Sequence, residues 1–247
     1  MQTLEGILVD LDGTVLGGGR LLPGAGAFLR AVSGRCIVVS NNAEHLPAEI
    51  ARKLCRLGVV LPPDSILLAS TLALERLAAQ RPGARVLVLA SGSLRRYAQY
   101  LGLRPSREGF DVVFLGRDRR FRYETLALAA NAVRRGARLV VANPDLAHPS
   151  PDGDIIPETG ALLRALLACT GSVPYDVVGK PEPHLFQAAL ERLGLRAHQV
   201  LMIGDNPETD GRGARDLGIP FVQVSPEYPL GPEILDLAPV WTAGASA

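Results

Sequence analysis

Short apolar runs alternate along the chain with stretches in which apolar residues recur at helical spacing. Nearly continuous apolar runs are typical of buried parallel strands, and amphipathic stretches between them are typical of helices packed on a sheet. The predicted strands cover residues 7–9, 36–39, 86–89, 112–115, 139–141, 177–178, 200–203 and 221–224, and the predicted helices cover residues 25–31, 47–57, 94–101, 123–133, 159–167, 185–193 and 208–217. The alternation predicts an α/β fold with parallel sheets.

Turn signals divide this alternation into blocks. Pro82-Gly83 marks the entry to a middle block, and residues 171–174 mark its exit. The block is about a hundred residues long, which is a common size for a small domain. We therefore predict a Rossmann-like core with a parallel sheet, made of residues 1–80 and 178–247, that is split by an inserted α/β domain of residues 81–177.

The bulk composition excludes several classes of protein. An apolar share of 47% and a net charge of +1 argue against a disordered chain, a nucleic-acid binder driven by bulk charge and a polybasic membrane anchor. No apolar run approaches the roughly 20 residues that span a bilayer, and the N-terminus lacks a secretory signal. Cys36, Cys55 and Cys169 have no metal-type spacing, so the sequence predicts a reduced, cytoplasmic setting.

The sequence DLDGT at residues 10–14 follows the first predicted strand directly. Ligands of open α/β sheets bind beyond the carboxyl ends of the strands, so Asp10 and Asp12 stand where an active site would form. Two carboxylates at this spacing repel each other unless a cation lies beside them, and a divalent metal is the usual solution. The alternative is an ordinary Asp-Gly turn at a strand end.

Three further motifs also follow predicted strands. Ser40-Asn41 offers a hydroxyl and backbone N–H groups that suit a phosphate, although a polar turn is an alternative. Lys180 could neutralise phosphate and carboxylates together, or be a solvated surface lysine. Asp205 repeats the position of Asp10 at a strand tip, with helix capping together with Glu208 as the alternative. Asp210 follows in the next helix, where a favourable interaction with the helix dipole is the alternative. Their shared placement at the strand ends of one split domain predicts a single site.

The order of these motifs resembles that of the haloacid dehalogenase-like hydrolase superfamily. The segments FDVVFLGRDR (110–119), VVANPD (140–145), IPETGAL (156–162) and VGKPEP (178–183) resemble its large α/β-cap subfamily, type IIA, which is NagD-like or p-nitrophenylphosphatase-like. The resemblance implies that residues 1–80 and 178–247 are a catalytic core and that residues 81–177 are a cap that sets substrate specificity. Glu158 departs from the subfamily, in which a glycine is usual at this point.

The resemblance also implies roles for the motif residues. Asp10 is expected to be the nucleophile that forms an aspartyl-phosphate, and Asp12 the general acid and base. Mg²⁺ is expected to be bound by Asp10, by Asp12 through its main-chain carbonyl and by Asp205, with Asp210 beside these ligands. Ser40, Asn41 and Lys180 are expected to hold the transferring phosphoryl group. A carboxylate needs such cations to attack an anionic phosphate, which agrees with these roles.

The expected activity is hydrolysis of small phosphomonoesters, such as a nucleotide, a sugar phosphate, phosphoglycolate or pyridoxal phosphate. A phosphotransferase or mutase that uses the same aspartyl-phosphate is the nearest alternative, and a non-catalytic metabolite-binding protein is a more distant one. Asn143, Asp145 and His148 follow a predicted strand of the middle block and are candidates for substrate specificity, although His148 could be an exposed loop histidine. The expected partner is a small phosphorylated metabolite, with no nucleic acid or membrane, and the resemblance is compatible with a homodimer.

Overall fold

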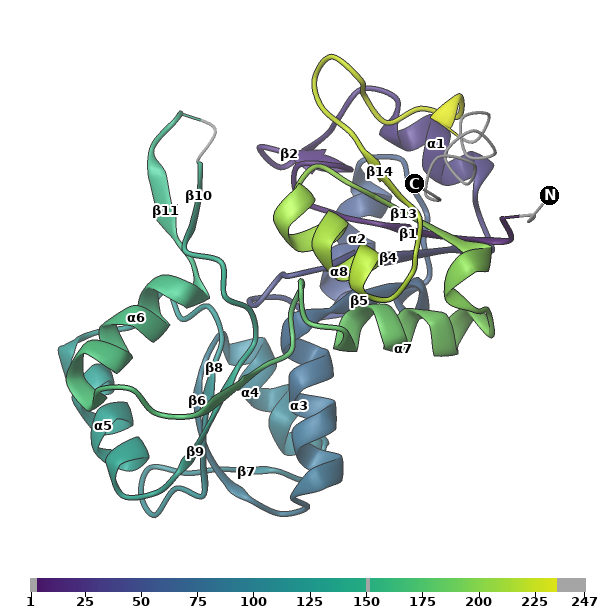
Figure 1. The fold of residues 1–247 in the computed structure, drawn as a ribbon. Coiled ribbons are helices and arrows are strands. Elements are labelled where there is room, and N and C mark those ends of the chain that lie inside the picture. Colours follow the sequence, from purple (N-terminus) through teal and green to yellow (C-terminus); the bar gives the residue numbers. More distant parts are fainter. Residues whose placement is uncertain (1–3, 150–151, 235–247) are drawn as a thin grey trace. The chain divides into compact units, whose positions relative to one another are not determined.

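The computed structural model describes residues 4–149 and 152–234 (Figure 1). Residue contacts separate it into two compact units, each assembled from distant segments of the chain. The first unit comprises the described residues of Met1–Ser40, Pro47–Leu67 and Lys180–Ala247, and the second comprises those of Asn41–Leu46 and Leu68–Gly179. Each unit has a sheet with parallel strands and surrounding helices, so the predicted α/β fold class is confirmed.

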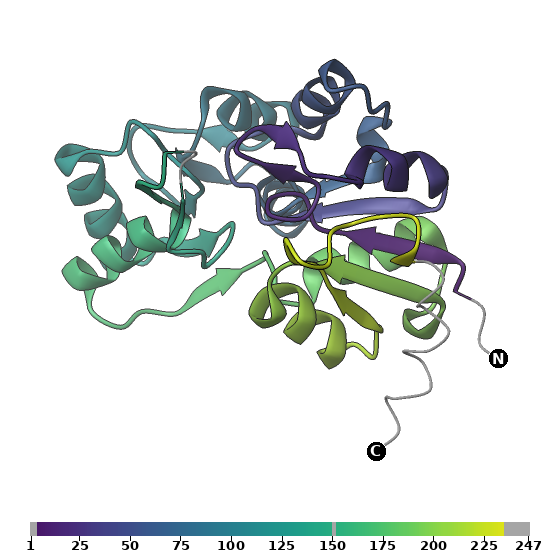
Figure 2. The ribbon, with the colours of Figure 1, turned by 90° about the horizontal axis from the view of Figure 1, so that it is seen from above.

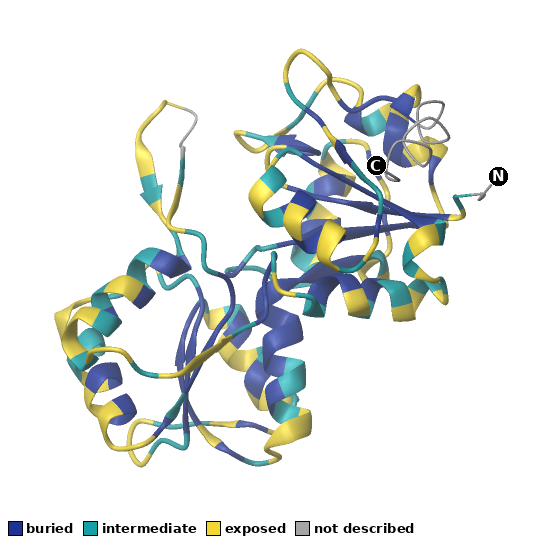
Figure 3. Ribbon diagram, in the orientation of Figure 1, coloured by how far each residue is buried: buried dark blue, intermediate teal, exposed yellow. Residues whose placement is uncertain are grey.

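The sheet of the first unit has five strands in the order β14-β13-β1-β4-β5. Their bounds, in that order, are Phe221–Gln223, Val200–Gly204, Gly6–Val9, Cys36–Ser40 and Ile66–Leu68. β1 pairs in parallel with β4 and with β13, so that Val9 is the partner of both Val38 and Ile203; the purple β1 lies beside the green β13 in both Figure 1 and Figure 2. β1, β4 and β13 are buried along their whole length (Figure 3), which explains their continuous apolar sequences.

The helices of the first unit are short and amphipathic. They are α1 (Ala25–Ala31), α2 (Pro47–Arg56), α7 (His184–Leu193) and α8 (Arg212–Asp216), with 3₁₀ turns at Pro63–Ser65 and Ala197–Gln199 and a small hairpin of β2 (Leu16–Gly17) and β3 (Arg20–Leu21). α7 buries Leu185, Phe186 and Ala189 and contacts β1 and β4. The helix predicted at 208–217 begins instead as a π-helical turn, Pro207–Gly211, before α8. π-helical turns are rare in proteins, and many of those that do occur lie at functional sites.

The second unit repeats the architecture with its own parallel sheet, in the order β12-β9-β8-β6-β7. These strands are Tyr175–Val177, Arg138–Val141, Val112–Leu115, Arg85–Leu89 and Arg104–Pro105; the helices are α3 (Ala69–Gln80), α4 (Gly92–Tyr100), α5 (Tyr123–Arg134) and α6 (Thr159–Thr170); and β10 (Ala147–Pro149) and β11 (Ile155–Pro157) form a hairpin. α3 and α4 lie on one face of the sheet and α5 and α6 on the other (Figure 1). Within the described ranges, no helix is both long and apolar enough to cross a bilayer.

The second unit extends beyond the predicted residues 81–177 at both ends. On the N-terminal side it also includes α3 and residues 41–46, and on the C-terminal side residues 178 and 179. Helical spacing does not reveal α3, since seven of its residues are buried, among them every residue from 69 to 74. A helix that is buried on most sides lacks the polar face that makes its period visible. The roles of the two units as catalytic core and cap stay predictions.

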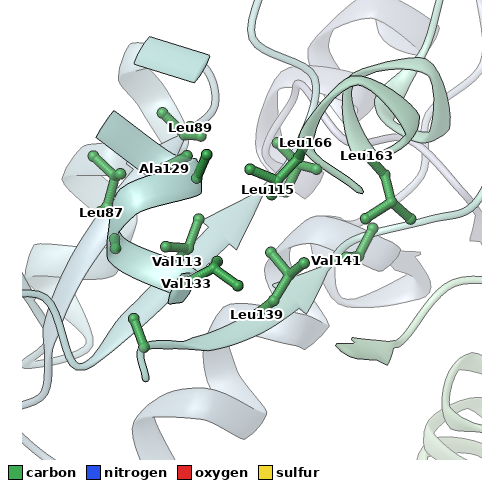
Figure 4. Close-up of a cluster of buried hydrophobic side chains, with 13 residues drawn as sticks. Leu87, Leu89, Val113, Leu115, Ala129, Val133, Leu139, Val141, Leu163 and Leu166 are labelled. Atoms are coloured by element: carbon green, nitrogen blue, oxygen red, sulfur yellow. The ribbon is translucent and has the colours of Figure 1, made fainter. Parts of the chain in front are cut away.

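The core of the second unit lies between its sheet and helices α5 and α6 (Figure 4). Strand residues such as Val113 and Leu139 point from the sheet, and Val133 of α5 and Leu166 of α6 pack against them. Their close packing makes the unit sensitive to lost volume, because a truncated side chain leaves a cavity that neighbours fill only in part.

We therefore expect Leu139→Ala to lower the free energy of unfolding of the second unit by about 2–5 kcal/mol, since Leu139 has no exposed surface. The matched control is Leu128→Ala on α5, whose leucine is 38% exposed. Urea denaturation followed by circular dichroism measures both. Equal midpoints for the two variants would show that this cluster is not the core of the unit.

Candidate active site

The predicted motif residues of the first unit meet at one edge of its sheet. β1 ends at Val9, directly before Asp10; β4 ends with Ser40; and β13 ends with Gly204, directly before Asp205. Because these strands are parallel and neighbouring, their carboxyl ends lie together, as strand-end reasoning predicts. The chain re-enters this unit at Lys180.

Lys180 is the centre of the cluster and is only 2% exposed. Its Nζ donates to Asp10 Oδ1 at 2.6 Å, to Asp210 Oδ1 at 2.6 Å and to the carbonyl oxygen of Val39 at 3.0 Å. An ammonium group has three N–H donors, so these partners satisfy it completely. The alternative of a solvated surface lysine is therefore excluded.

Charge explains how an ammonium group stays protonated at this depth. Burial alone would lower the pKa of Lys180, but the negative charges of Asp10 and Asp210 outweigh burial and raise the pKa. Burial likewise raises the pKa of Asp210 to about 7, and the charge of Lys180 opposes a further rise. The pKa of Asp205 is also raised, first by burial and then by the negative charge of Asp10.

The three acids have the donor set of a metal site. Asp10, Asp205 and Asp210 each offer an oxygen within 4.8 Å of the others. Asp10 Oδ2 is buried and has no hydrogen-bond partner among the described residues, although a buried polar atom normally has one. Oxygen ligands suit a hard divalent cation such as Mg²⁺, and such an ion would relieve the repulsion among the carboxylates. These residues therefore fit Mg²⁺, and the carboxylate of Asp210 lies close enough to be considered with those of Asp10 and Asp205; which of the three bind the ion directly stays a prediction.

Two glycines make room for these carboxylates. Gly13 has φ +93°, and a Cβ there would collide with the carboxylate of Asp205. A Cβ on Gly204 would collide in the same way with the carboxylate of Asp210. Asp12 is exposed in the turn between β1 and β2, and its predicted role as acid and base stays a prediction.

Thr14 and Asn206 also belong to the cluster, although the sequence gives them no role. The Thr14 hydroxyl donates to Asp205 Oδ1 at 3.5 Å, and the Asn206 backbone N–H donates to Asp210 Oδ2 at 3.3 Å. The Asn206 side chain also caps the π-helical turn by accepting from the Glu208 N–H at 2.9 Å. The capping role considered as an alternative for Asp205 is thus filled by its neighbour Asn206. The Asn-Pro pair at 206–207 is the signal that could have indicated it.

The predicted specificity residues lie in the second unit, each with a partner there. Asn143 is 1% exposed; its Nδ2 donates to the Asn41 carbonyl, and its Oδ1 accepts from the Asp145 N–H at 3.0 Å. Both carboxylate oxygens of Asp145 accept from Asn41 Nδ2, at 3.1 and 3.2 Å. His148 Nδ1 lies 2.7 Å from Glu158 Oε1. Their predicted role in substrate choice stays a prediction.

Glu158, which stands where the resembled subfamily usually has a glycine, belongs to a charge cluster. The Arg117 guanidinium lies 3.2 Å from Glu158 and 3.3 Å from Glu44. Burial raises the pKa of Glu158, and the charges of Arg117 and His148 oppose this. No pattern along the sequence predicts this cluster, because its members come from separate segments of the second unit.

Comparison with known proteins identifies the family. The profile of the haloacid dehalogenase-like hydrolases matches residues 7–104, and a HAD-hydrolase-like profile matches residues 177–226. A dihydroxyacetone phosphatase of Corynebacterium glutamicum (strain R) is 30% identical, with 95% of this chain and 90% of that protein covered. The chain belongs to the haloacid dehalogenase-like hydrolases.

Solved structures of the family agree with this assignment. Glycerol phosphate phosphatase Rv1692 from Mycobacterium tuberculosis, in complex with magnesium, superposes with a TM-score of 0.83 at 36% identity and covers 90% of this chain and 68% of its own. The 4-nitrophenylphosphatase of Thermotoga maritima gives a TM-score of 0.84 at 28% identity, with 91% of this chain and 88% of its own covered. The predicted subfamily and the predicted phosphatase class of enzyme are confirmed.

Lys180→Met tests the ion cluster formed by Lys180, Asp10 and Asp210. The substitution leaves the two carboxylates buried without their cation. We expect the free energy of unfolding at pH 8 to fall by about 3–5 kcal/mol. The deficit should shrink at pH 5, since a carboxyl group whose folded pKa is raised, as that of Asp210 is to about 7, gains a proton as pH falls through that value and then needs no cation.

Lys53→Met is the matched control, because Lys53 is the only other lysine of the chain and lies on α2. Chemical denaturation at both pH values measures the effect. A deficit for Lys180→Met that equals that of the control, or that grows toward low pH, would contradict the assigned charge balance.

Proposed function

We propose that this protein is a Mg²⁺-dependent phosphatase that hydrolyses small phosphomonoesters through an aspartyl-phosphate on Asp10. The observation that carries the proposal is the buried cluster in which Lys180 holds Asp10 Oδ1 while Asp10 Oδ2 has no partner among the described residues. A carboxylate fixed in this way is oriented for attack, and its charge is partly offset by the neighbouring ammonium group. Family membership supports the same chemistry.

The reaction divides into two steps that the named residues can perform. In the first, the Asp10 carboxylate attacks phosphorus, the bond from phosphorus to the ester oxygen breaks, and Asp12 gives its proton to the leaving oxygen. In the second, Asp12 takes a proton from water, the water oxygen attacks phosphorus, and the bond to Asp10 breaks to release phosphate.

Positive charge must accompany this transfer, because both the nucleophile and the phosphate are anionic. Lys180 supplies one charge, and Ser40 and the Asn41 N–H are proposed to orient the phosphoryl oxygens. Asp10, Asp205 and Asp210, with the main-chain carbonyl of Asp12, would hold Mg²⁺, which supplies charge neutralisation for the spreading negative charge. The magnesium-bound structure of the Mycobacterium relative supports this choice of ion.

The proposed substrates are small metabolites that carry one phosphate ester. The named relatives include phosphatases for dihydroxyacetone phosphate and glycerol phosphate and a 5'-nucleotidase, which supports sugar or polyol phosphates and nucleotides as the classes to test first. Phosphoglycolate and pyridoxal phosphate belong in the same panel. The ratio kcat/KM ranks these compounds, because it measures discrimination between competing substrates.

Asp10→Asn is expected to abolish turnover of p-nitrophenyl phosphate, with a loss of at least about a thousandfold, because an amide cannot form the acyl phosphate. EDTA should abolish the activity of the wild-type protein, and added Mg²⁺ should restore it. Asp216→Asn, which changes an exposed acid of α8, is the control and should retain full activity. Asp10→Asn with wild-type turnover would exclude Asp10 as the nucleophile.

Labelled water separates hydrolysis from phosphoryl transfer to another acceptor. In H₂¹⁸O, a hydrolase should release phosphate that carries one ¹⁸O atom from solvent, because water attacks the phosphorus atom of the intermediate. Mass spectrometry of the phosphate measures the label. A new phosphate ester formed with an added alcohol or sugar, in place of labelled phosphate, would favour the phosphotransferase alternative.

A further inference from the structure

Residues 41–46 are an excursion of the chain from one unit into the other. They lie between β4 and α2, both of which belong to the first unit, yet their contacts place them in the second. The boundary falls at the peptide bond between Ser40 and Asn41. This peptide carries the Asn41 N–H that is proposed to bind phosphate, so the inference below rests on the proposed function.

Four consecutive backbone carbonyls of this excursion accept hydrogen bonds from the second unit. The carbonyl of Asn41 accepts from Asn143 Nδ2, that of Asn42 from the Ser70 hydroxyl at 3.2 Å, that of Ala43 from the Arg117 N–H at 2.9 Å, and that of Glu44 from the Ser91 hydroxyl at 2.6 Å. Three donors lie two residues beyond the ends of strands: Ser91 after β6, Arg117 after β8 and Asn143 after β9. The excursion therefore lies across the carboxyl edge of the second sheet.

Side chains reinforce the attachment at both ends of this run. Asp145 holds the Asn41 amide with both carboxylate oxygens, and Arg117 pairs with the Glu44 carboxylate at 3.3 Å. Gly179 leaves room for this arrangement, since a Cβ there would lie 2.6 Å from Asn41 Oδ1. The position of Asn41 is thus determined by side chains and backbone of the second unit.

We infer that residues 41–46 are a positioning arm, and that Asn143 and Asp145 act as positioning residues for phosphate binding through Asn41. On the Ser40 side, the peptide is fixed by β4, in which Ser40 is 2% exposed. On the Asn41 side, it is fixed by Asn143 and Asp145. The orientation of the N–H in this peptide therefore depends on the second unit, and Asn143 and Asp145 influence all substrates alike, because every substrate carries the same phosphoryl group.

The expected size of the effect follows from the accuracy that phosphoryl transfer requires. Groups that bind the reacting atoms must be placed within about 0.5 Å, and an error of about 1 Å can cost two orders of magnitude in rate. A loosened arm should shift the Asn41 N–H without removing it. We expect a loss of roughly tenfold in kcat/KM for Asp145→Ala and for Asn143→Ala.

The kinetic test compares substrates with different leaving groups. Asp145→Ala and Asn143→Ala should lower kcat/KM by the same factor for p-nitrophenyl phosphate, glycerol 3-phosphate and AMP, and should weaken binding of inorganic phosphate in Mg²⁺, measured by calorimetry. Asp145→Asn keeps one carbonyl oxygen for the Asn41 amide and should recover part of the loss. Losses that differ between leaving groups, with unchanged phosphate binding, would overturn the inference in favour of direct substrate contact.

A second measurement does not depend on turnover. Hydrogen–deuterium exchange should become faster in residues 41–46 of Asp145→Ala, whereas the strands of both sheets should keep their protection. Asp176→Ala is the matched control, because it breaks the 2.6 Å ion pair of Asp176 with Arg138 in the same unit but does not touch the arm. Unchanged exchange at 41–46 would overturn the inference.

The outcomes distinguish this inference from the proposed function. If the wild-type protein binds phosphate but hydrolyses no ester, the proposed hydrolase fails, and the exchange and calorimetry still decide whether the arm positions the phosphate. If the wild-type protein binds no phosphate in Mg²⁺, the inference is overturned as well.

Discussion

The burial of one ammonium group governs the arrangement of the first unit. Lys180 can lie in the interior only if charged and polar oxygens satisfy it, and these come from three distant places: Asp10 after β1, the Val39 carbonyl of β4 and Asp210 in the turn after β13. The need to satisfy Lys180 therefore holds the N-terminal segment with Asp10 and the later segment with Asp210 at one edge of the sheet. The same contacts leave the second oxygen of Asp10 available for chemistry. In the proposed mechanism, stability and reactivity therefore depend on the same set of charges.

Much of the fold could be predicted because each central strand is buried on both faces. The apolar runs at residues 7–9, 112–115 and 200–203 correspond to β1, β8 and β13 within one residue at either end. β5 and α3 could not be predicted in the same way, because residues 66–74 are buried in both elements and show no change of period where the strand becomes a helix. Tertiary burial there hides the local signal.

The candidate site could be predicted to a similar extent, and for a related reason. Polar and charged residues that directly follow apolar runs indicated Asp10, Ser40, Lys180 and Asp205, since parallel strands bring their carboxyl ends together. The positions of the Thr14 and Asp210 side chains in the cluster depend on how a turn of the backbone places them. The spacing of residues in the sequence does not determine this. The pairing of Arg117 with Glu158 and Glu44 joins residues far apart in the sequence, and no pattern within any one segment indicates it.

The contacts of the ion cluster and those of the positioning arm differ in kind, and this difference explains why the domain boundary near Asn41 could not be predicted. The ion cluster is built from side chains, so its members are visible as residue types. The positioning arm is held mainly by its backbone carbonyls, which every residue has, and its donors Ser70, Ser91 and Asn143 are common polar residues. Substitutions in the arm at positions other than Asn41 and Glu44, whose side chains are themselves held by Asp145 and Arg117, should thus matter less than substitutions of these donors. An attachment of this kind can persist while the sequence of the attached segment changes, because the acceptor atoms belong to the main chain.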